Sequence, residues 1–453
     1  MKPRFREYLG DRAFYNKLVT IALPIALQGL INIGVNMMDN IMVGQLRETA
    51  IAATSLANQF INVFHIFCMG MGMGASVFTS RYWGMQDIPS LKKAVTIMYR
   101  LCLFLGSLFT IATIVAPGAI MSIYTTSPDV IAEGIRYFGW SIPCYLLLGF
   151  SLTTTIVLRS IGQVKMPLYC SIAAFFINVG ANYIFIFGKF GAPAMGVAGA
   201  ALGTFIARLF EFVIICGYFL FLEKKVAYRI KDAFTKCGDM VKEYIRISIP
   251  VLISDGMLAL GNNSVAMIVG RLGDSFVSAN GIASVIMQFS TVFISGLSNG
   301  SAIMTGHTLG EGDVEKAKKQ GWTFLGLGVI IGLIACGIIL IISGPIISLY
   351  NITPETVDIT KQLISSLAII AVFQTANSIL TKGVLRGGGD TKFLMVADIL
   401  FLWIASVPLG YLCGITWGLS PFITYTALKI DQIIKAIWCV FRLKSNKWIK
   451  RIK

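Results

Sequence analysis

The sequence is poor in charge and in histidine, and it lacks the motifs on which many enzymes and metal sites depend. Only 13% of its 453 residues are Asp, Glu, Lys or Arg, only two are His, and the nine Cys form no CxxC pair. It contains no HExxH pattern, no Walker A sequence and no constellation for a nucleophile. The scarcity of charge excludes an ordinary soluble globule, and the missing motifs leave an enzyme or an ATP-driven pump unsupported. We expect no cofactor, and we interpret the cysteines as small apolar packing residues.

What the sequence does contain is long apolar stretches. Hydrophobic residues make up 56% of the chain and the mean hydropathy is +0.75. Runs of roughly 20 apolar residues, each about long enough to cross a bilayer, recur along the whole length. This pattern predicts an all-α integral membrane protein of about twelve transmembrane helices. The predicted spans are 18–43, 55–79, 95–119, 135–157, 167–188, 197–222, 244–269, 280–305, 321–345, 362–383, 394–415 and 418–440.

A net charge of +16 would suit a protein that binds nucleic acid. The positions of the basic residues show whether it instead reflects membrane topology. On the predicted spans, roughly 32 of the 38 Lys and Arg fall on one side. Arg4 and Arg6 precede the first span, and Lys224 and Lys225 begin a basic central loop. The positive-inside rule makes that side cytoplasmic, with both termini there, in a multi-pass protein of the cell membrane. The charge therefore reflects topology, and no nucleic acid is expected.

The two halves of the sequence resemble each other. Position n matches position n + 226 over a long stretch, beginning with Pro24 and Pro250 and continuing through VGQL and VGRL. Each repeat contains six spans, an even number, so both halves enter the membrane from the same side. This is a parallel repeat of two pseudo-symmetric six-helix lobes. The predicted domains are an N-terminal lobe 1–222, a basic cytoplasmic linker 223–242 and a C-terminal lobe 243–453.

Such a repeat usually builds two lobes around a cavity near the bilayer midplane. We therefore expect a central cleft, and the alternative is a duplication that builds only a scaffold. The two matched prolines interrupt the first helix of each half. They either permit bending there or only kink a helix end.

One carboxylate lies late in the first predicted span. Asn32 and Asn36 lie roughly two turns and one turn before Asp39, on the same helical face. Because an ionisable side chain at mid-bilayer costs about 3 kcal/mol, Asp39 needs a partner or a function. We interpret it as a cation-coupling residue that can bind H+ or, as the one metal left open, Na+. The alternative is a carboxylate at the outer interface, since Gly44 is only about 8 Å of helix further on.

Neutral side chains can complete this site. Asn178 and Asn182 are one helical turn apart, so their amides point the same way, and amide oxygens suit a cation. Hydrogen bonding between helices would also account for them. Asn36 and Thr204 are the further partners that we assign to Asp39.

The second half offers a candidate secondary polar site made of Asp255, Asn262 and Asn377. The roles of Asp255 and Asp398 stay open at this point.

Two other acids have structural partners nearby in the sequence. Glu211 is expected to pair with Arg208 at i,i+3, and Asp431 with Lys435 at i,i+4. The glycine run GMGMGAS from Gly70 lacks the ending of a phosphate loop, so it predicts close helix packing.

These motifs together resemble the multidrug and toxic compound extrusion (MATE) family, bacterial type, over essentially all twelve spans. The matching features are Pro24, the D-x-x-M-V-G segment from Asp39, the asparagine pair before IFG, GVAGAALGT from Gly196, and VLRGGGDTK from Val384. The resemblance implies an antiporter that exports small organic compounds, often cationic and aromatic, in exchange for H+ or Na+. The family's first-helix carboxylate corresponds to Asp39 and its fifth-helix partners to Asn178 and Asn182, where related members often have Asp at the second position.

The hypothesis is alternating access, with the lobes rocking about their pseudo-two-fold axis while Asp39 binds the cation. One rival is a lipid-linked oligosaccharide flippase, which should line its cavity with Arg and Lys that this sequence largely lacks there. Another is a membrane receptor or scaffold that moves nothing. A two-lobed chain needs no second copy to form its pathway, so we expect a monomer whose partners are small molecules, the ion and the lipid bilayer.

Overall fold

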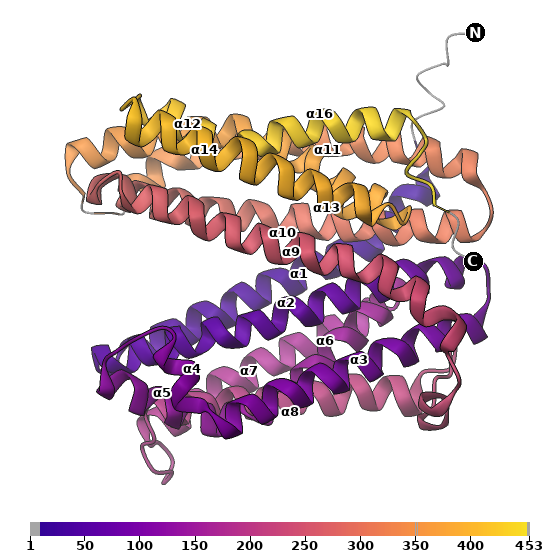
Figure 1. Ribbon diagram of the computed structural model, residues 1–453, viewed down its shortest axis with the longest axis horizontal. Helices are drawn as coiled ribbons and strands as arrows, with labels where there is room; N and C mark the ends of the chain where they lie inside the picture. The colour runs from indigo at the N-terminus through magenta and orange to yellow at the C-terminus, as the bar shows by residue number, and fades with distance from the viewer. Residues whose placement is uncertain (1–9, 349, 351, 451–453) are drawn as a thin grey trace. The chain divides into compact units, whose positions relative to one another are not determined.

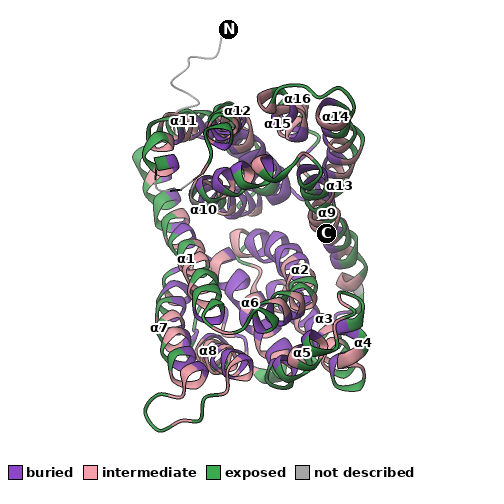
Figure 2. Ribbon diagram, turned by 90° about the vertical axis from the view of Figure 1, so that its left-hand side faces the viewer, coloured by how far each residue is buried: buried purple, intermediate pink, exposed green. Residues whose placement is uncertain are grey.

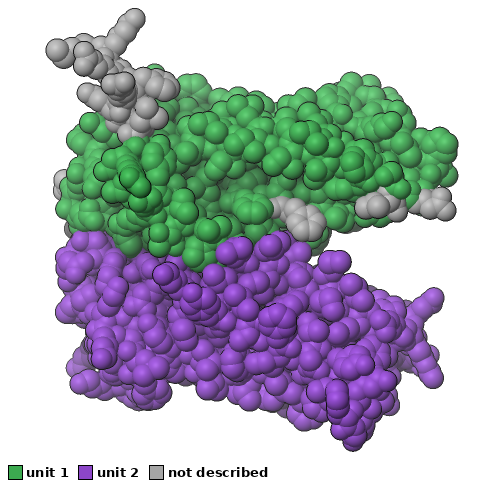
Figure 3. Space-filling model, turned by 180° about the vertical axis from the view of Figure 1, so that it is seen from behind, with its two compact units in different colours: residues 1–26, 253–453 green, residues 27–252 purple. Residues whose placement is uncertain are grey.

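The computed structural model describes residues 10–348, 350 and 352–450, and no strand occurs among them. The chain divides into two compact units (Figure 3). Unit 1 consists of Met1–Ala26 and Ile253–Lys453, and unit 2 of Leu27–Leu252. Arg4 and Arg6, two of the basic residues predicted on the cytoplasmic side, lie outside the described residues. The predicted lobe boundaries come from the sequence repeat and stay a prediction.

The first half of the chain is a series of long helices with short connections (Figure 1). Proline in the first turn of α3, α4 and α5 fixes the backbone where each of these helices starts. The elements are α1 (Arg12–Gly44), α2 (Glu48–Gly84), α3 (Ile88–Val115), α4 (Pro117–Ser122), α5 (Pro128–Ser141), α6 (Cys144–Ser160), α7 (Lys165–Phe187), α8 (Val197–Gly217), and the short helices η2 (Tyr218–Leu222) and η3 (Ile230–Phe234).

The second half repeats this pattern, with π-helical turns inside its later helices. Thr353 caps α12 and Ser420 caps α15, each with a side-chain oxygen on a backbone N–H of the first turn. The elements are α9 (Gly238–Gly270), α10 (Asp274–Gly310), α11 (Val314–Ser348), α12 (Pro354–Ser378), η4 (Ile379–Leu385), α13 (Thr391–Leu400), η5 (Phe401–Ser406), α14 (Val407–Tyr411), η6 (Leu412–Thr416), α15 (Pro421–Leu428) and α16 (Ile430–Lys444).

The predicted all-α membrane fold is confirmed. Nine helices of the described chain are long and apolar enough to cross a membrane, or eleven if each of two bent pairs counts as one span. One bent pair is α5 with α6, which meet at 55° within the predicted span 135–157. The remaining predicted span, 418–440, is formed by α15 and α16 and contains Lys429, Asp431 and Lys435. These findings are consistent with about twelve crossings.

Large apolar side chains remain exposed on the helices. Figure 2 shows exposed residues alternating with buried ones around them, and the exposed set includes Phe104, Val115, Phe176 and Ile341 at 67–77% exposure. In water such surfaces would promote association, whereas in a bilayer they face lipid tails.

The helices α1 and α9 each pass from one unit to the other shortly after their proline. The unit boundaries follow Ala26 in α1 and Leu252 in α9, two residues beyond Pro24 and Pro250. In unit 2, the start of α9 packs on α2, where the Tyr244 hydroxyl donates to the Met71 carbonyl at 2.8 Å. The first part of each of these helices therefore belongs to the unit that contains most of the opposite sequence half.

Glycines of α2 and α10 receive these crossing segments. A Cβ at Gly74 would lie 2.7 Å from Ser248 Cβ, and one at Gly296 would lie 2.6 Å from the Ala22 carbonyl oxygen. The predicted packing role of the glycine run is thus confirmed at Gly74, where only hydrogen leaves room for the backbone of α9. We call Gly70 and Gly74 of α2, with Gly296 and Gly300 of α10, the crossing glycines. Gly70 matches Gly296 in the repeat, and Gly74 matches Gly300.

The segment between η2 and α9 is bound to one face of α3. Lys92 Nζ lies 2.9 Å from Asp232 Oδ2. One turn later Thr96 Oγ1 donates to the Asp232 carbonyl oxygen at 3.0 Å, and a further turn on Arg100 donates to two carbonyl oxygens of the segment. Residues 92, 96 and 100 recur every fourth position, so they share a face of the helix. The basic linker predicted from sequence is therefore held against unit 2 over much of its length.

The Lys92–Asp232 pair predicts a pH dependence of this docking. Burial raises the pKa of the Asp232 carboxyl, but hydrogen bonds from Lys92 and from the Arg229 backbone outweigh it, so the pKa lies below its ordinary value of 3.8. A lowered pKa in the docked state means that docking is stabilised above the ordinary pKa and weakens as pH falls below about 4. We expect Asp232→Asn to speed amide exchange in residues 228–235 about two- to fivefold at pH 7, as ~0.5–1 kcal/mol gives.

Hydrogen-exchange mass spectrometry at several pH values measures this. The ratio of exchange rates between Asp232→Asn and wild type should approach one as the carboxyl becomes protonated. A ratio of one already at pH 7 would show that the ion pair does not hold the segment.

Candidate functional site

Asp39 lies on α1 within unit 2 and meets an asparagine of α7. Asn182 Nδ2 donates to Asp39 Oδ1 at 2.5 Å, and the same Nδ2 lies 3.4 Å from Asn178 Oδ1, one turn earlier. Asn178 and Asn182 are 2% and 1% exposed. The structure thus brings together the carboxylate and both amides that the helical spacing indicated.

The second atom of the Asn182 amide is an unused acceptor. Asn182 Oδ1 is buried and has no hydrogen-bond partner in the described chain. It faces Gly203 of α8, where a Cβ would lie 3.0 Å from Asn182 Cγ. Since the amide donates through Nδ2, its oxygen remains available as a ligand. A carboxylate with amide oxygens beside it suits Na+, and the carboxylate alone suits H+.

Two of the residues assigned to this site make no described hydrogen bond to Asp39. Asn36 is exposed and Thr204 is half-buried, and among the described hydrogen bonds none joins either to Asp39. Their assignment stays a prediction. A larger cluster for a metal is also missing from the described residues, which hold no group of three His, Cys, Asp or Glu side chains suited to one.

Sequence reasoning missed Gln28, which anchors the same part of α1. Its Nε2 donates to Ser171 Oγ of α7 at 2.7 Å, and its Oε1 accepts from Arg159 of α6. Gln28 is buried, and it lies 11 positions, about three turns, before Asp39. The signal available in the sequence was a glutamine inside a predicted span, close to the proline that interrupts the helix. The bonds of Gln28 hold α1 against α7, which carries both asparagines, and against α6.

The expected pairs of charged residues are confirmed. Arg208 Nη1 lies 2.6 Å from Glu211 Oε2, and Lys435 Nζ lies 2.9 Å from Asp431 Oδ2. The Arg208–Glu211 pair is on α8.

The candidate secondary site has a different arrangement in unit 1. Asp255 is 3.6 Å from Arg386, and Asn377 Nδ2 donates to Gln432 Oε1 at 2.8 Å. Asn262 is exposed. The described contacts do not join these three residues to one another, and their role stays a prediction. Asp398, whose role was open, is 7% exposed and accepts from Ser254 and Lys435.

The close approach of Gly203 to Asn182 predicts that a larger residue at position 203 would disturb the site. In Gly203→Ala the new Cβ meets the Asn182 side chain, so we expect the protein to be destabilised by about 1–3 kcal/mol and the Asn182–Asp39 bond to be displaced. Thermal unfolding in detergent measures the first effect. Gly217→Ala on the same helix is the control, because nothing lies within 4 Å of a Cβ there. Equal unfolding temperatures for both variants would refute the close approach.

A match between the sequence and a protein-family model identifies the family. A family model described as MatE matches residues 24–184 and again 250–412, once in each half of the repeat. The chain belongs to the MatE family. It is therefore a multi-pass membrane transporter of the MATE type, as its motifs suggested.

Named relatives match this MATE protein over nearly its full length. The uncharacterized transporter YisQ of Bacillus subtilis is 23% identical over 98% of this chain and 96% of its own. The multidrug resistance protein MdtK of Yersinia pseudotuberculosis is 24% identical over 96% and 95%. A crystal structure of MATE in the bent conformation superposes with a TM-score of 0.87 at 19% identity, covering 98% of both chains, which establishes the fold.

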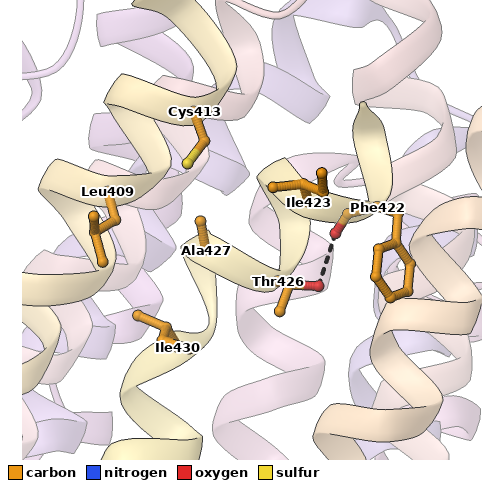
Figure 4. A pocket seen from close by; sticks show the side chains of 7 residues that line it. All are labelled: Leu409, Cys413, Phe422, Ile423, Thr426, Ala427 and Ile430. Atoms are coloured by element: carbon orange, nitrogen blue, oxygen red, sulfur yellow. Dashed lines mark hydrogen bonds between the residues drawn. The ribbon is translucent and has the colours of Figure 1, made fainter. Parts of the chain in front are cut away.

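An apolar pocket of about 250 Å³ in unit 1 of the MATE protein is not part of the Asp39 site (Figure 4). Its lining comes from α14, η6, α15 and the start of α16, and includes Leu409, Cys413 and Phe422. Within it Thr426 Oγ1 donates to the Phe422 carbonyl oxygen at 2.7 Å, so its hydroxyl is already used inside its own helix. None of the seven labelled residues is charged, so the pocket offers no electrostatic attraction for an ion.

Proposed function

We propose that the protein is a secondary active antiporter that exports small organic compounds, often cationic and aromatic, in exchange for H+ or Na+ by alternating access. The observation that carries this proposal is the hydrogen bond between Asn182 and Asp39 inside membrane-crossing helices. A half-buried carboxylate whose contact is a neutral amide can bind a cation, because no fixed positive partner touches it. The MdtK relative, named for multidrug resistance, supports the substrate class.

Cation binding can favour one access state only if it alters the packing of α1. Asp39 and Gln28 both tie α1 to α7, and the part of α1 before Leu27 belongs to the other unit. Neutralising Asp39 removes the charge that attracts the Asn182 amide, so the cation changes the strength of one of these two ties. A ligand shifts a two-state equilibrium by as much as its affinities for the states differ.

The proposal includes a monomer in the cell membrane with both termini in the cytoplasm, and lobes at 1–222 and 243–453. The alternation of basic loops in the sequence supports this orientation.

The test is export of a fluorescent organic cation from proteoliposomes under an imposed pH gradient and, separately, an imposed Na+ gradient. Export driven by one gradient and unaffected by the other identifies the ion. If folded protein exports nothing under either gradient, the antiporter proposal fails and a receptor or lipid-linked flippase becomes the better account.

A further inference from the structure

Unit 1 contains a buried cluster of charged side chains that the Asp39 site does not include. Lys435 of α16 is 2% exposed and pairs with two carboxylates, Asp398 Oδ1 at 3.2 Å and Asp431 Oδ2 at 2.9 Å. Ser254 of α9 donates to Asp398, and Ser406 at the end of η5 donates to Asp431 at 2.9 Å. The ammonium group therefore joins α13 to α16, and two serines from α9 and η5 support its carboxylate partners.

The surroundings of this ammonium are rich in oxygen acceptors. The Gln432 amide donates to Asp431 Oδ2 at 2.6 Å, and Asn377 of α12 donates in turn to Gln432 Oε1. The Asn377 oxygen, in a residue 5% exposed, is left with no hydrogen-bond partner in the described chain. Two carboxylates around one positive group are ligands of the kind that a cation site uses, and the Asn377–Gln432 pair supports one of them from behind. Here the cation is covalently attached.

The repeat supports the same interpretation. Position 265, which matches Asp39, is Val, so the second half does not duplicate the carboxylate of the first. Its buried acids on α13 and α16 instead have a permanent positive partner. Lys429, at the junction before α16, makes no ion pair with Asp398 or Asp431 among the described residues.

We propose that the cluster of Asp398, Asp431 and Lys435 is a cation site for a primary alkylammonium group, filled by the protein's own lysine. It rests on the proposed antiport for its consequence: Asp398 and Asp431 carry no exchangeable ion. A buried ion pair that only joins helices would not select a cation with the shape of an alkylammonium group.

Chemical rescue tests the site without any transport. Lys435→Ala removes three methylene groups and the ammonium, the volume of propylammonium. We expect this variant to unfold at a lower temperature than wild type, and propylammonium to raise its unfolding temperature by several degrees. The neutral isostere 1-propanol should not. In Lys435→Ala with Asp398→Asn the rescue should weaken, and wild type should show none. Equal effects of propylammonium and 1-propanol would overturn the proposal.

A second variant decides the matter even if Lys435→Ala does not fold. Asp398→Asn keeps Lys435 paired with Asp431, so the number of ions exchanged per substrate in proteoliposomes should equal that of wild type. A change in that ratio would mean that Asp398 carries an exchangeable ion, which overturns the proposal. Absence of gradient-driven export in wild type would refute the antiport alone, because the rescue is measured on purified protein.

Discussion

Replacing Asp39 by Asn is expected to abolish ion-driven export while leaving the protein folded. The amide keeps the size of the side chain and can still accept a hydrogen bond from Asn182 Nδ2, so the contact between α1 and α7 survives in weaker form. What disappears is the charge that holds H+ or Na+. Coupling free energies of ~1–3 kcal/mol correspond to roughly 5- to 150-fold, so gradient-driven export should fall by a factor in that range.

The measurement is the initial export rate in proteoliposomes under whichever gradient drives wild type. Asp274→Asn is the matched control, because this exposed acid in the first turn of α10 has no place in the site. It should export at the wild-type rate. Binding of substrate to Asp39→Asn, measured by fluorescence anisotropy without a gradient, should persist. Wild-type export by Asp39→Asn would remove Asp39 from the coupling site.

The parts of this structure that follow from local spacing could be predicted, because helical periodicity fixes them. The pairing of Arg208 with Glu211 and of Asp431 with Lys435 needed only the i,i+3 and i,i+4 rule. The shared direction of Asn178 and Asn182 likewise followed from one turn of helix. That these amides complete a site with Asp39 was a hypothesis from their residue type, which the family resemblance also implied, since spacing cannot show which helices are neighbours.

Contacts between distant segments were not predictable in the same way. Asp398 was left open because its partners Ser254 and Lys435 lie 144 and 37 residues away. The passage of α1 and α9 between units also depends on which helix each segment packs against. A proline shows where a helix can bend, but it does not identify the helix against which the bent segment packs.

The crossing glycines give the second large expected effect. In Gly74→Ala the methyl group meets Ser248, with Cβ–Cβ at 2.7 Å and Cα at 3.0 Å, and in Gly296→Ala it meets the Ala22 carbonyl oxygen and Ala26 Cβ. Both obstacles include backbone or Cβ atoms, which cannot rotate away as a long side chain would. Overpacking of this kind costs about 1–3 kcal/mol. We expect each variant to unfold at a lower temperature and to export more slowly.

The repeat supplies matched controls for these two variants. Gly44 and Gly270 end α1 and α9, match each other in the repeat, and have nothing within 4 Å of a Cβ. Alanine there should leave stability unchanged or raise it by up to about 1 kcal/mol, because alanine favours helix more than glycine does. If Gly74→Ala and Gly296→Ala behave like these controls, the crossing segments are not packed as closely as the structure places them. If only the crossing variants lose stability and export, the transport cycle requires the first parts of α1 and α9 to pack against these glycines. A penalty of ~1–3 kcal/mol on the packed state reduces its population roughly 5- to 150-fold.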